Sequence, residues 1–381
     1  MSSATEVRMS SQQNFIAGKL GRRQALKLGV GLAAGLAAPS IFNINHAFSQ
    51  DVRYSGEVFD AGGAVLNIGE WGGGWEEFVR ANLTNQFEKD FNCKINWDSS
   101  FPWFPKFATS GARNPVFDIC NWNLPNLTQT KQAGDYFLNV DEILANVPNA
   151  NKCWDFAFSS GAGITWAYQP YVYAYRTDNA DKPTSFRSFW DSKYANRRGT
   201  YNAANGLYHC WFMACAKEWG KDQYDLEAAF KAIKDAMLMK ISEFTFNMLT
   251  MMERNEVDMA VHIQGEALSL KRKGVPVDVW EWDSHPILTQ TKTISRYSDP
   301  MQKRLAFALL NRTLNPSFLE AFGDEFLWRP TNREAGITEY LAANGTQNSA
   351  DAASNFWVPD WDFFVANKME ITDRTNEIFG L

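Results

Sequence analysis

Carboxylates stand beside large aromatic rings at points of the sequence where a predicted strand ends. Glu70 comes just before Trp71 and Trp75 in the glycine-rich stretch EWGGGW. In a similar way, Asp283 directly follows Trp282. Because a ring face attracts a cation by about 0.5–2 kcal/mol and a carboxylate adds a charge-assisted hydrogen bond, this pairing predicts a site for an organic amine. A sugar or an aromatic acid stacked on the tryptophans is the alternative.

Four further residues are expected to contact the ligand, since they lie near predicted strand ends or near a predicted crossing between domains. They are Trp122, Trp166, Tyr168 and Glu266. Glu266 is also consistent with an acidic residue that the dipole favours at a helix N-terminus. Amides at the start of a helix beginning at Trp75 could instead hold an anion, which would reverse the charge of the ligand.

Signatures of catalysis and of metal binding are missing from the sequence. The histidines beyond the first fifty residues, His209, His262 and His285, are far apart and lack the spacing of metal ligands. No nucleophile elbow, zinc-protease motif or Walker loop is present. We therefore expect a binding protein without enzyme activity, cofactor or metal. An exported enzyme on the same fold is the alternative from another class.

The elements that must position these residues follow an α/β pattern. With 45% hydrophobic and 21% charged residues among 381, the composition is that of a globular protein with one large or two medium domains. Strand-like runs separated by helical patterns predict a parallel sheet, and ligands of such sheets bind beyond the carboxyl ends of the strands. The first three predicted strands are residues 65–69, 94–97 and 116–120.

Three segments should therefore cluster at one edge of the sheet, because each follows one of these strands. They are residues 70–75, 99–103 and 121–123. A helix is predicted at 75–91, between the first two strands. Further along, extended runs at 163–168 and 171–176 are separated by Gln169-Pro170, where we expect the chain to cross between lobes because proline interrupts central pairing.

The first fifty residues resemble a bacterial Tat export signal. The pair Arg22-Arg23 precedes an apolar stretch at 28–38, and Ala47 and Ser49 are the small residues that a signal peptidase reads. Cleavage is expected after Ser49. The segment 1–49 carries a net charge of +4 within a chain of −6, so the mature protein would be near −10, which argues against nucleic acid as a partner.

All five cysteines lie beyond the expected cleavage point. An oxidising periplasm permits one or two disulfides and leaves at least one thiol unpaired. Burial as small apolar side chains is favoured for most of them. The cysteines are Cys93, Cys120, Cys153, Cys210 and Cys215.

Three passages, in order along the chain, resemble bacterial extracellular solute-binding proteins of ABC importers, specifically the spermidine/putrescine-binding type. NQFEKDF at 85–91 is similar to the family's F-E-x-x-T/F-G. YRTD at 175–178 with PTSFRSFWD at 183–191 is similar to Y-N-T-D and P-x-S-W-x-D-L-W-D. NEVDMAV at 255–261 with KGVPV at 273–277 is similar to G-E-x-D-x-A and G-x-P-V. Two departures stand out, Arg176 for the usual Asn and Glu281-Trp282-Asp283 for a Pro-Glu-Gly turn.

The resemblance implies a two-lobed α/β fold of the type II periplasmic-binding class. Each lobe would be a mostly parallel sheet flanked by helices, and two crossovers would form a hinge that closes on the ligand. The implied division is a signal at 1–49, the first part of lobe 1 at 50–168, lobe 2 at 169–284, and a return crossover with C-terminal helices, mostly in lobe 1, at 285–381.

The resemblance also implies a function. It is that of a monomeric periplasmic receptor, which delivers a polyamine or another organic amine to permease subunits in the inner membrane. A carboxylate or a sugar stays open as the ligand. Fe(III) also stays open as the ligand, because Tyr171, Tyr173 and Tyr175 share one strand face and iron-binding relatives use paired tyrosines. The favoured interpretation is that these tyrosines belong to a packed strand face.

Overall fold

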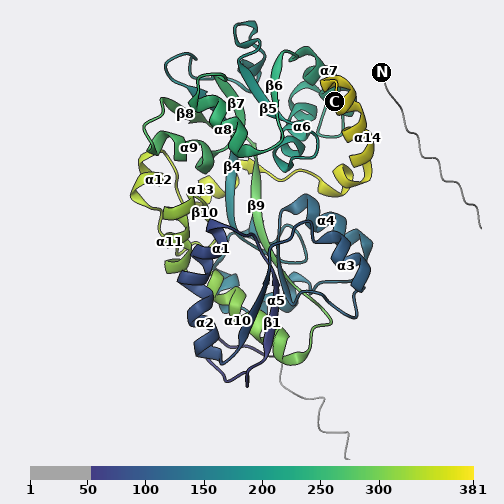
Figure 1. Cartoon of the computed structure of the whole chain (residues 1–381), viewed down its shortest axis with the longest axis vertical. Helices are drawn as coiled ribbons and strands as arrows, with labels where there is room; N and C mark the ends of the chain where they lie inside the picture. The colour runs from purple at the N-terminus through teal and green to yellow at the C-terminus, as the bar shows by residue number, and fades with distance from the viewer. Residues whose placement is uncertain (1–52) are drawn as a thin grey trace, which may run out of the picture. The chain divides into compact units, whose positions relative to one another are not determined.

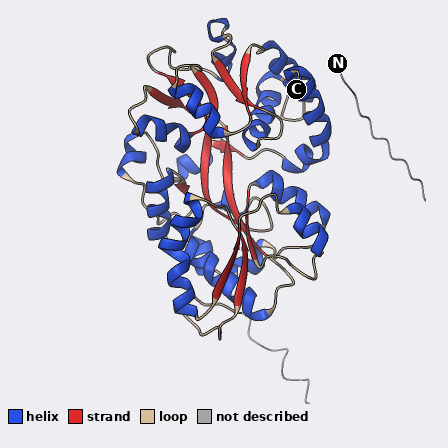
Figure 2. Cartoon of the chain, viewed as in Figure 1, coloured by secondary structure: helices blue, strands red, loops and turns tan. Residues whose placement is uncertain are grey.

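The computed structural model describes residues 53–381 (Figure 1). The predicted export signal and its cleavage point lie outside these described residues. Within them, no helix is long and apolar enough to cross a membrane. The helices and strands fall into two groups, which we call the first lobe and the second lobe, and two long strands run through both (Figure 2).

The first lobe is built on the parallel strands that the sequence predicts. In Figure 1 it forms the lower half of the described chain. Strand β1 (Val65–Gly69) pairs with β2 (Lys94–Asp98) and with β3 (Ile119–Trp122), both in parallel. The third strand begins three residues later than predicted and ends two residues later. The helices of this part are α1 (Gly74–Val79), a π-helical turn (Arg80–Thr84), α2 (Asn85–Phe91), α3 (Phe104–Ser110), α4 (Leu124–Ala133) and α5 (Val140–Leu144).

The second lobe repeats this plan with its own parallel strands. Strand β5 (Arg198–Tyr201) pairs in parallel with β6 (Met239–Ser242) and with β7 (Met259–Ile263). Strand β8 (Val277–Trp280) pairs antiparallel with β4, which is described next. The helices of this lobe are α6 (Gly206–Trp219), α7 (Leu226–Asp235), α8 (Thr245–Glu253) and α9 (Gln264–Arg272).

Strands β4 (Ile164–Arg176) and β9 (His285–Ile294) connect the lobes. They pair antiparallel with each other over Ile164–Pro170 of β4, after which β4 pairs with β7 from Tyr171 onward. The prediction of two runs broken at Pro170 is therefore wrong, because the strand is continuous. Pro170 lies where β4 exchanges one partner strand for another, so a proline, which has no N–H, is tolerated there.

The C-terminal part of the chain, from Pro300 onward, crosses the hinge and contacts both lobes. Figure 1 shows it, in yellow, passing from α12 and α13 across β9 to α14. Asp362 of α14 accepts a hydrogen bond from Gln132 of α4 at 2.9 Å, whereas Thr375 lies 2.6 Å from the Tyr208 hydroxyl of α6. The elements are α10 (Pro300–Thr313), α11 (Pro316–Phe326), β10 (Arg329–Pro330), α12 (Glu339–Ala343), α13 (Ala350–Ser354), β11 (Phe356–Trp357) and α14 (Trp361–Phe379).

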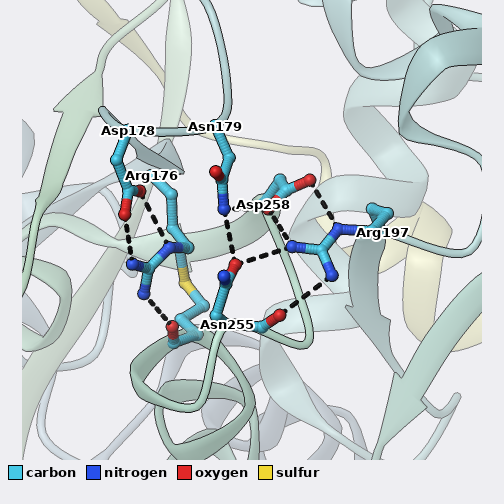
Figure 3. A network of polar contacts seen from close by, with 7 residues as sticks. Arg176, Asp178, Asn179, Arg197, Asn255 and Asp258 are labelled. Atoms are coloured by element: carbon cyan, nitrogen blue, oxygen red, sulfur yellow. Dashed lines mark hydrogen bonds and ion pairs between the residues drawn. The ribbon is translucent and has the colours of Figure 1, made fainter.

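Arg176, the departure from the Y-N-T-D pattern, lies in an internal polar network (Figure 3). Its guanidinium donates to both carboxylate oxygens of Asp178, at 3.0 and 2.6 Å, and to the carbonyl of Met252 at 2.6 Å. Nearby, Arg197 makes the same forked contact with Asp258, at 2.6 and 2.5 Å. Both arginines are therefore held by partners within the second lobe.

The five cysteines are all buried and unpaired. Burial raises the pKa of each thiol, to about 11 for Cys93 and Cys153 and to about 12 for Cys210. The interpretation as small apolar side chains is therefore confirmed, and the possible disulfides are not formed.

Candidate functional site

The first predicted contact, Glu70, is held inside the first lobe. Its carboxylate is ion-paired with the ammonium group of Lys292 and accepts a hydrogen bond from the Asn121 side chain at 2.8 Å. Only 1% of Glu70 and 7% of Lys292 is exposed. The negative charge that the sequence assigned to a ligand is therefore neutralised by a lysine on β9.

The polar network around Glu70 joins the ends of four strands. Trp71 donates through Nε1 to the Gln290 side chain at 2.7 Å, and Asn121 donates to the same oxygen at 2.7 Å. Trp166 donates through Nε1 to Asn121 Oδ1 at 3.0 Å. The Trp71 ring packs on Trp103 with centroids 4.8 Å apart. The prediction that the segments after β1, β2 and β3 cluster is therefore confirmed.

Trp75 of the glycine-rich turn and Trp122 of β3 pack in different parts of the core. Trp75 packs on Phe322 of α11 at 4.7 Å and on the buried Trp166 at 5.7 Å. Trp122, which is 1% exposed, packs on Trp103 and donates to the Thr293 hydroxyl at 2.9 Å. Trp75 and Trp166 thus belong to the first-lobe core, and Trp122 to the aromatic core beside it.

The remaining aromatic predictions lie elsewhere in the core. Trp282 packs on Tyr173 and Phe186, with centroids 5.2 Å away in both cases. Tyr168 packs on Phe156 at 4.9 Å. Asp283, next to Trp282, is exposed in the loop between β8 and β9. The nine predicted contacts are thus spread over several surroundings, and none of them has been tested with a ligand.

The alternating tyrosines also face into the core. The Tyr173 hydroxyl donates to the Phe186 carbonyl at 2.9 Å, and the Tyr171 hydroxyl donates to the Gly206 carbonyl at 3.2 Å. All three tyrosines are buried, as expected for a packed strand face. Over residues 53–381, no three His, Cys, Asp or Glu side chains come together as a metal site.

A narrow cavity lies where the two lobes meet at the hinge. Its wall comes from the starts of α4 and α6, from Tyr171, from residues 287–289 of β9 and from Trp361, the first residue of α14. The space of about 10 Å³ holds about one water molecule. No Lys, Arg, Asp or Glu belongs to this wall within the described chain. In this arrangement of the lobes the cavity is too small for an organic solute.

Polar atoms in and around this cavity lack partners. Asn123 Oδ1, Thr289 Oγ1 and Trp361 Nε1 are buried without a hydrogen bond in the described structure, and all three residues line the cavity. Buried polar groups are nearly always paired with protein or water. These atoms are therefore candidates for contacts with a bound solute.

Glu266 lies where β7 ends and α9 begins. Burial and, to a smaller extent, the charge of Glu266 raise the pKa of Tyr171 in the cavity wall. Its side chain is one-third exposed, but its Oε2 atom is buried and has no hydrogen-bond partner among residues 53–381. Burial raises the pKa of Glu266 to about 7. The pKa of Tyr201 is raised by burial and, to a smaller extent, by the nearby Glu266. Glu266 is thus a carboxyl group that changes charge near neutral pH.

The His262 ring lies next to Glu266 and is neutral. Its Nε2 atom is 3.8 Å from Glu266 Oε2, and burial lowers its pKa to about 4. Because the amide of Ile263 donates to Nδ1 at 2.9 Å, the ring proton of the neutral histidine is on Nε2. This N–H faces the carboxyl group of Glu266 from the core side.

Sequence reasoning found part of the interlobe cavity and missed the rest. Residues 121–123 were expected at the ligand-binding edge of the sheet, and Asn123 lines the cavity. Glu266 was also expected near a ligand but is not part of this wall, and Tyr171 was expected in a packed strand face. Thr289 and Trp361 were missed, since they lie on β9 and α14, which were not predicted as elements. No local pattern in the sequence connects them with Asn123, because the contact exists only in the folded hinge.

Residues 82–297 match the family of bacterial extracellular solute-binding proteins. Because the match covers more than half of the chain, the protein belongs to this family. Members of the family bind solutes rather than convert them, which agrees with the expected lack of enzyme activity. A search of curated proteins gave no match.

Solved structures share the two-lobed fold at low sequence identity. An ABC transporter protein from Clostridium perfringens has a TM-score of 0.69 and 20% identity, covering 83% of this chain and 99% of that one. A putative extracellular solute-binding protein from Bordetella parapertussis has a TM-score of 0.69 and 18% identity, covering 82% and 98%. MotA of A. tumefaciens B6, in complex with glucopine, has a TM-score of 0.63 and 16% identity, covering 83% and 99%. The predicted type II periplasmic-binding fold is thereby confirmed.

Proposed function

We propose that the protein captures a small organic amine between its lobes and delivers it to the permease of an ABC importer. The proposal rests on Glu266. This carboxylate has a buried oxygen without a partner, and its charge acts on Tyr171, which lines a cavity whose wall carries no charged residue. A solute ammonium group would give that oxygen a charge-assisted hydrogen bond.

The other groups of the cavity suit the remainder of such a solute. Tyr171 and Trp361 offer ring surfaces to an apolar stem. The side-chain oxygen of Asn123 can accept a hydrogen bond, and the hydroxyl group of Thr289 can donate or accept one. Of the nine contacts predicted from sequence, only Glu266 is part of the proposed site. Its other members are Tyr171, Trp361, Asn123 and Thr289.

Lobe separation is the step that admits the solute. Strands β4 and β9, together with the C-terminal segment that also crosses the hinge, link the two lobes covalently. One lobe turns relative to the other on these links, and closure then excludes water from the contact. Export by the Tat pathway to the periplasm and action as a monomer belong to the same proposal. The support for export is the twin-arginine segment and the membership in an extracellular family.

A carboxylate is the second candidate ligand, because two helix N-termini border the cavity. Helices α4 and α6 both begin there, at Leu124 and Gly206. The positive end of a helix dipole favours an anion. Solved proteins of this fold differ in ligand, since one is named for ferric ion, one for GABA and one holds glucopine; GABA carries both an amine and a carboxylate.

A thermal-shift screen tests the proposal, because a ligand of the folded state raises the melting temperature. We expect putrescine or spermidine to raise Tm and succinate or glucose not to do so. Glu266→Gln should abolish the shift. Glu253→Gln, an exposed acidic residue on α8, is the control and should retain it. A shift with succinate alone would replace the amine by the carboxylate.

A further inference from the structure

A second, larger cavity lies beside the hinge and shares no lining residue with the interlobe cavity. Its volume is about 530 Å³. Its wall comes from the loop before β9, from Arg329 of β10 and from the segment 345–355 around α13. The polar groups used below are Glu281, His285, Gln347, Asp351 and Asn355.

His285 lines this cavity and has an unprotonated ring nitrogen. The residue is 2% exposed, and its Nδ1 atom lies 2.9 Å from the Trp282 carbonyl. A carbonyl only accepts, so Nδ1 carries the ring proton. Burial lowers the pKa of His285 and keeps the ring neutral. Its Nε2 is therefore a free acceptor, and no hydrogen bond reaches it from the described chain.

A second free acceptor stands next to it. Glu281 Oε2 is 3.8 Å from His285 Nε2, which is too long for a hydrogen bond. The other oxygen of Glu281 is occupied by Arg329 and by the Gln264 side chain, which donates at 2.7 Å. Arg329 also donates to Gln264 Oε1 at 3.0 Å. The arginine is thus engaged, and two acceptors face one space without a donor.

We propose that this cavity binds the primary ammonium group of a small polar molecule, which donates to His285 Nε2 and Glu281 Oε2 together. A nitrogen about 2.8 Å from each atom spans their separation of 3.8 Å. Asp351 adds a second negative charge to the wall. Gln347 and Asn355 supply donors and acceptors for hydroxyl groups on the rest of the molecule.

A metal ion fits this cavity less well. A catalytic or structural zinc site has three or four protein ligands, and no group of three His, Cys, Asp or Glu suitable for a metal occurs within residues 53–381. The guanidinium of Arg329 also lies on the same carboxylate, where it would repel a divalent cation about twice as strongly as a singly charged ammonium group. An ammonium group, with one charge and several donors, matches both free acceptors.

Occupation of the cavity would connect two distant parts of the chain. His285 begins β9, one of the two hinge strands, whereas Asp351 belongs to the C-terminal segment that crosses the hinge. The bound molecule would hold these parts together. This site is independent of the proposed interlobe site, because the two sets of lining residues do not overlap.

Isothermal titration calorimetry of the whole protein tests the proposal. Glucosamine is the ligand, and glucose, which lacks the amine, is the control. We expect heat from glucosamine only, and about tenfold weaker binding in Asp351→Asn. The control is Glu339→Gln, which removes an exposed charge from the first turn of α12 outside the cavity; it should bind glucosamine as the parent does.

The ring nitrogens of His285 give a second, direct measurement. In a ¹⁵N-labelled protein, glucosamine should shift the Nε2 resonance of His285, identified by its loss in His285→Gln, because a lone pair that accepts a hydrogen bond becomes shielded. Equal heats from glucose and glucosamine would overturn the proposal. So would an unmoved His285 resonance at saturation, or a shift produced by Zn²⁺ and not by glucosamine.

Discussion

Glu70 and Lys292 form a buried ion pair across 222 positions of sequence. The pair connects the end of β1 with the hinge strand β9. Asn121 adds a hydrogen bond to the Glu70 carboxylate at 2.8 Å, so the acid is bound on both oxygens. The charge at the end of the first strand is thus part of the scaffold of the first lobe.

Glu70→Gln should therefore act on stability. Removing one partner of a buried pair leaves the other charge uncompensated, and we expect a loss of about 3–5 kcal/mol in the free energy of unfolding. Urea unfolding followed by tryptophan fluorescence measures it. Replacing both residues at once, as Glu70→Gln with Lys292→Met, should recover much of the loss. A single variant of unchanged stability that no longer binds amines would instead make Glu70 a ligand contact.

The affinity for an amine should depend on pH through Glu266. Its pKa of about 7 in the free protein means that a proton must leave before an ammonium group can pair with it. Binding should therefore tighten as pH rises through 7 and weaken by up to tenfold per unit below it. Titrations of putrescine between pH 5.5 and 8.5 measure this slope.

The variant Glu266→Gln separates this effect from other titrating groups. It should bind weakly and with no slope near pH 7. The same raised pKa also affects folding. Between its ordinary value of 4.5 and about 7, the folded state holds a proton that the unfolded chain has lost, so this group's contribution to stability falls as pH rises. A parent protein whose amine affinity is flat from pH 5.5 to 8.5 would contradict the role of Glu266.

Gly265 marks a close approach between β4, α9 and the segment before β10. A Cβ atom there would lie 2.5 Å from the Leu327 carbonyl oxygen and 2.6 Å from Gln169 Nε2. Gly265→Ala should therefore cost about 1–3 kcal/mol of stability, measured by urea unfolding. Gly74→Ala, where a Cβ meets nothing within 4 Å, is the matched control. Equal stabilities would show that the backbone at Gly265 moves freely.

Trp361 allows the cavity wall to be changed without removing its packing. Its indole N–H is buried without a partner in the part of the chain described, so Trp361→Phe removes no internal hydrogen bond. We expect stability to change by about 1 kcal/mol or less. The affinity for an amine that also carries a carboxylate, such as GABA, should weaken about three- to tenfold, the size of one hydrogen bond, because the indole N–H needs an acceptor and a protonated diamine has none. Calorimetric titration beside urea unfolding tests this. Loss of stability with unchanged affinity would make Trp361 a purely structural residue.

Local signals predicted most of the elements. Apolar runs located β1 and β2, and helical periodicity located the segment that became α1, the π-helical turn and α2. Strand β9 escaped prediction, because Thr289, Gln290 and Lys292 are polar yet buried. Their burial is stabilised by partners on other strands, and a sequence pattern does not reveal such partners.

The site was predicted less completely, for the same physical reason. Because an acid stands next to a tryptophan, Glu70 and Trp71 were expected to face a ligand. In the structure Glu70 is paired with Lys292 and Trp71 donates to Gln290, both on β9. Trp122 and Trp166 were expected to contact the ligand, whereas both are 1% exposed. Which aromatic rings face solvent depends on how the lobes pack, and residue type alone carries no such information.

The five buried thiols bear on where the protein can complete its folding. Every cysteine of the chain lies in the described part and is free, so no covalent bond has to form before the lobes, the hinge and α14 reach their final arrangement. Folding can be completed in a reducing cytoplasm. The thiols are kept protonated by burial and are therefore poorly reactive toward oxidants.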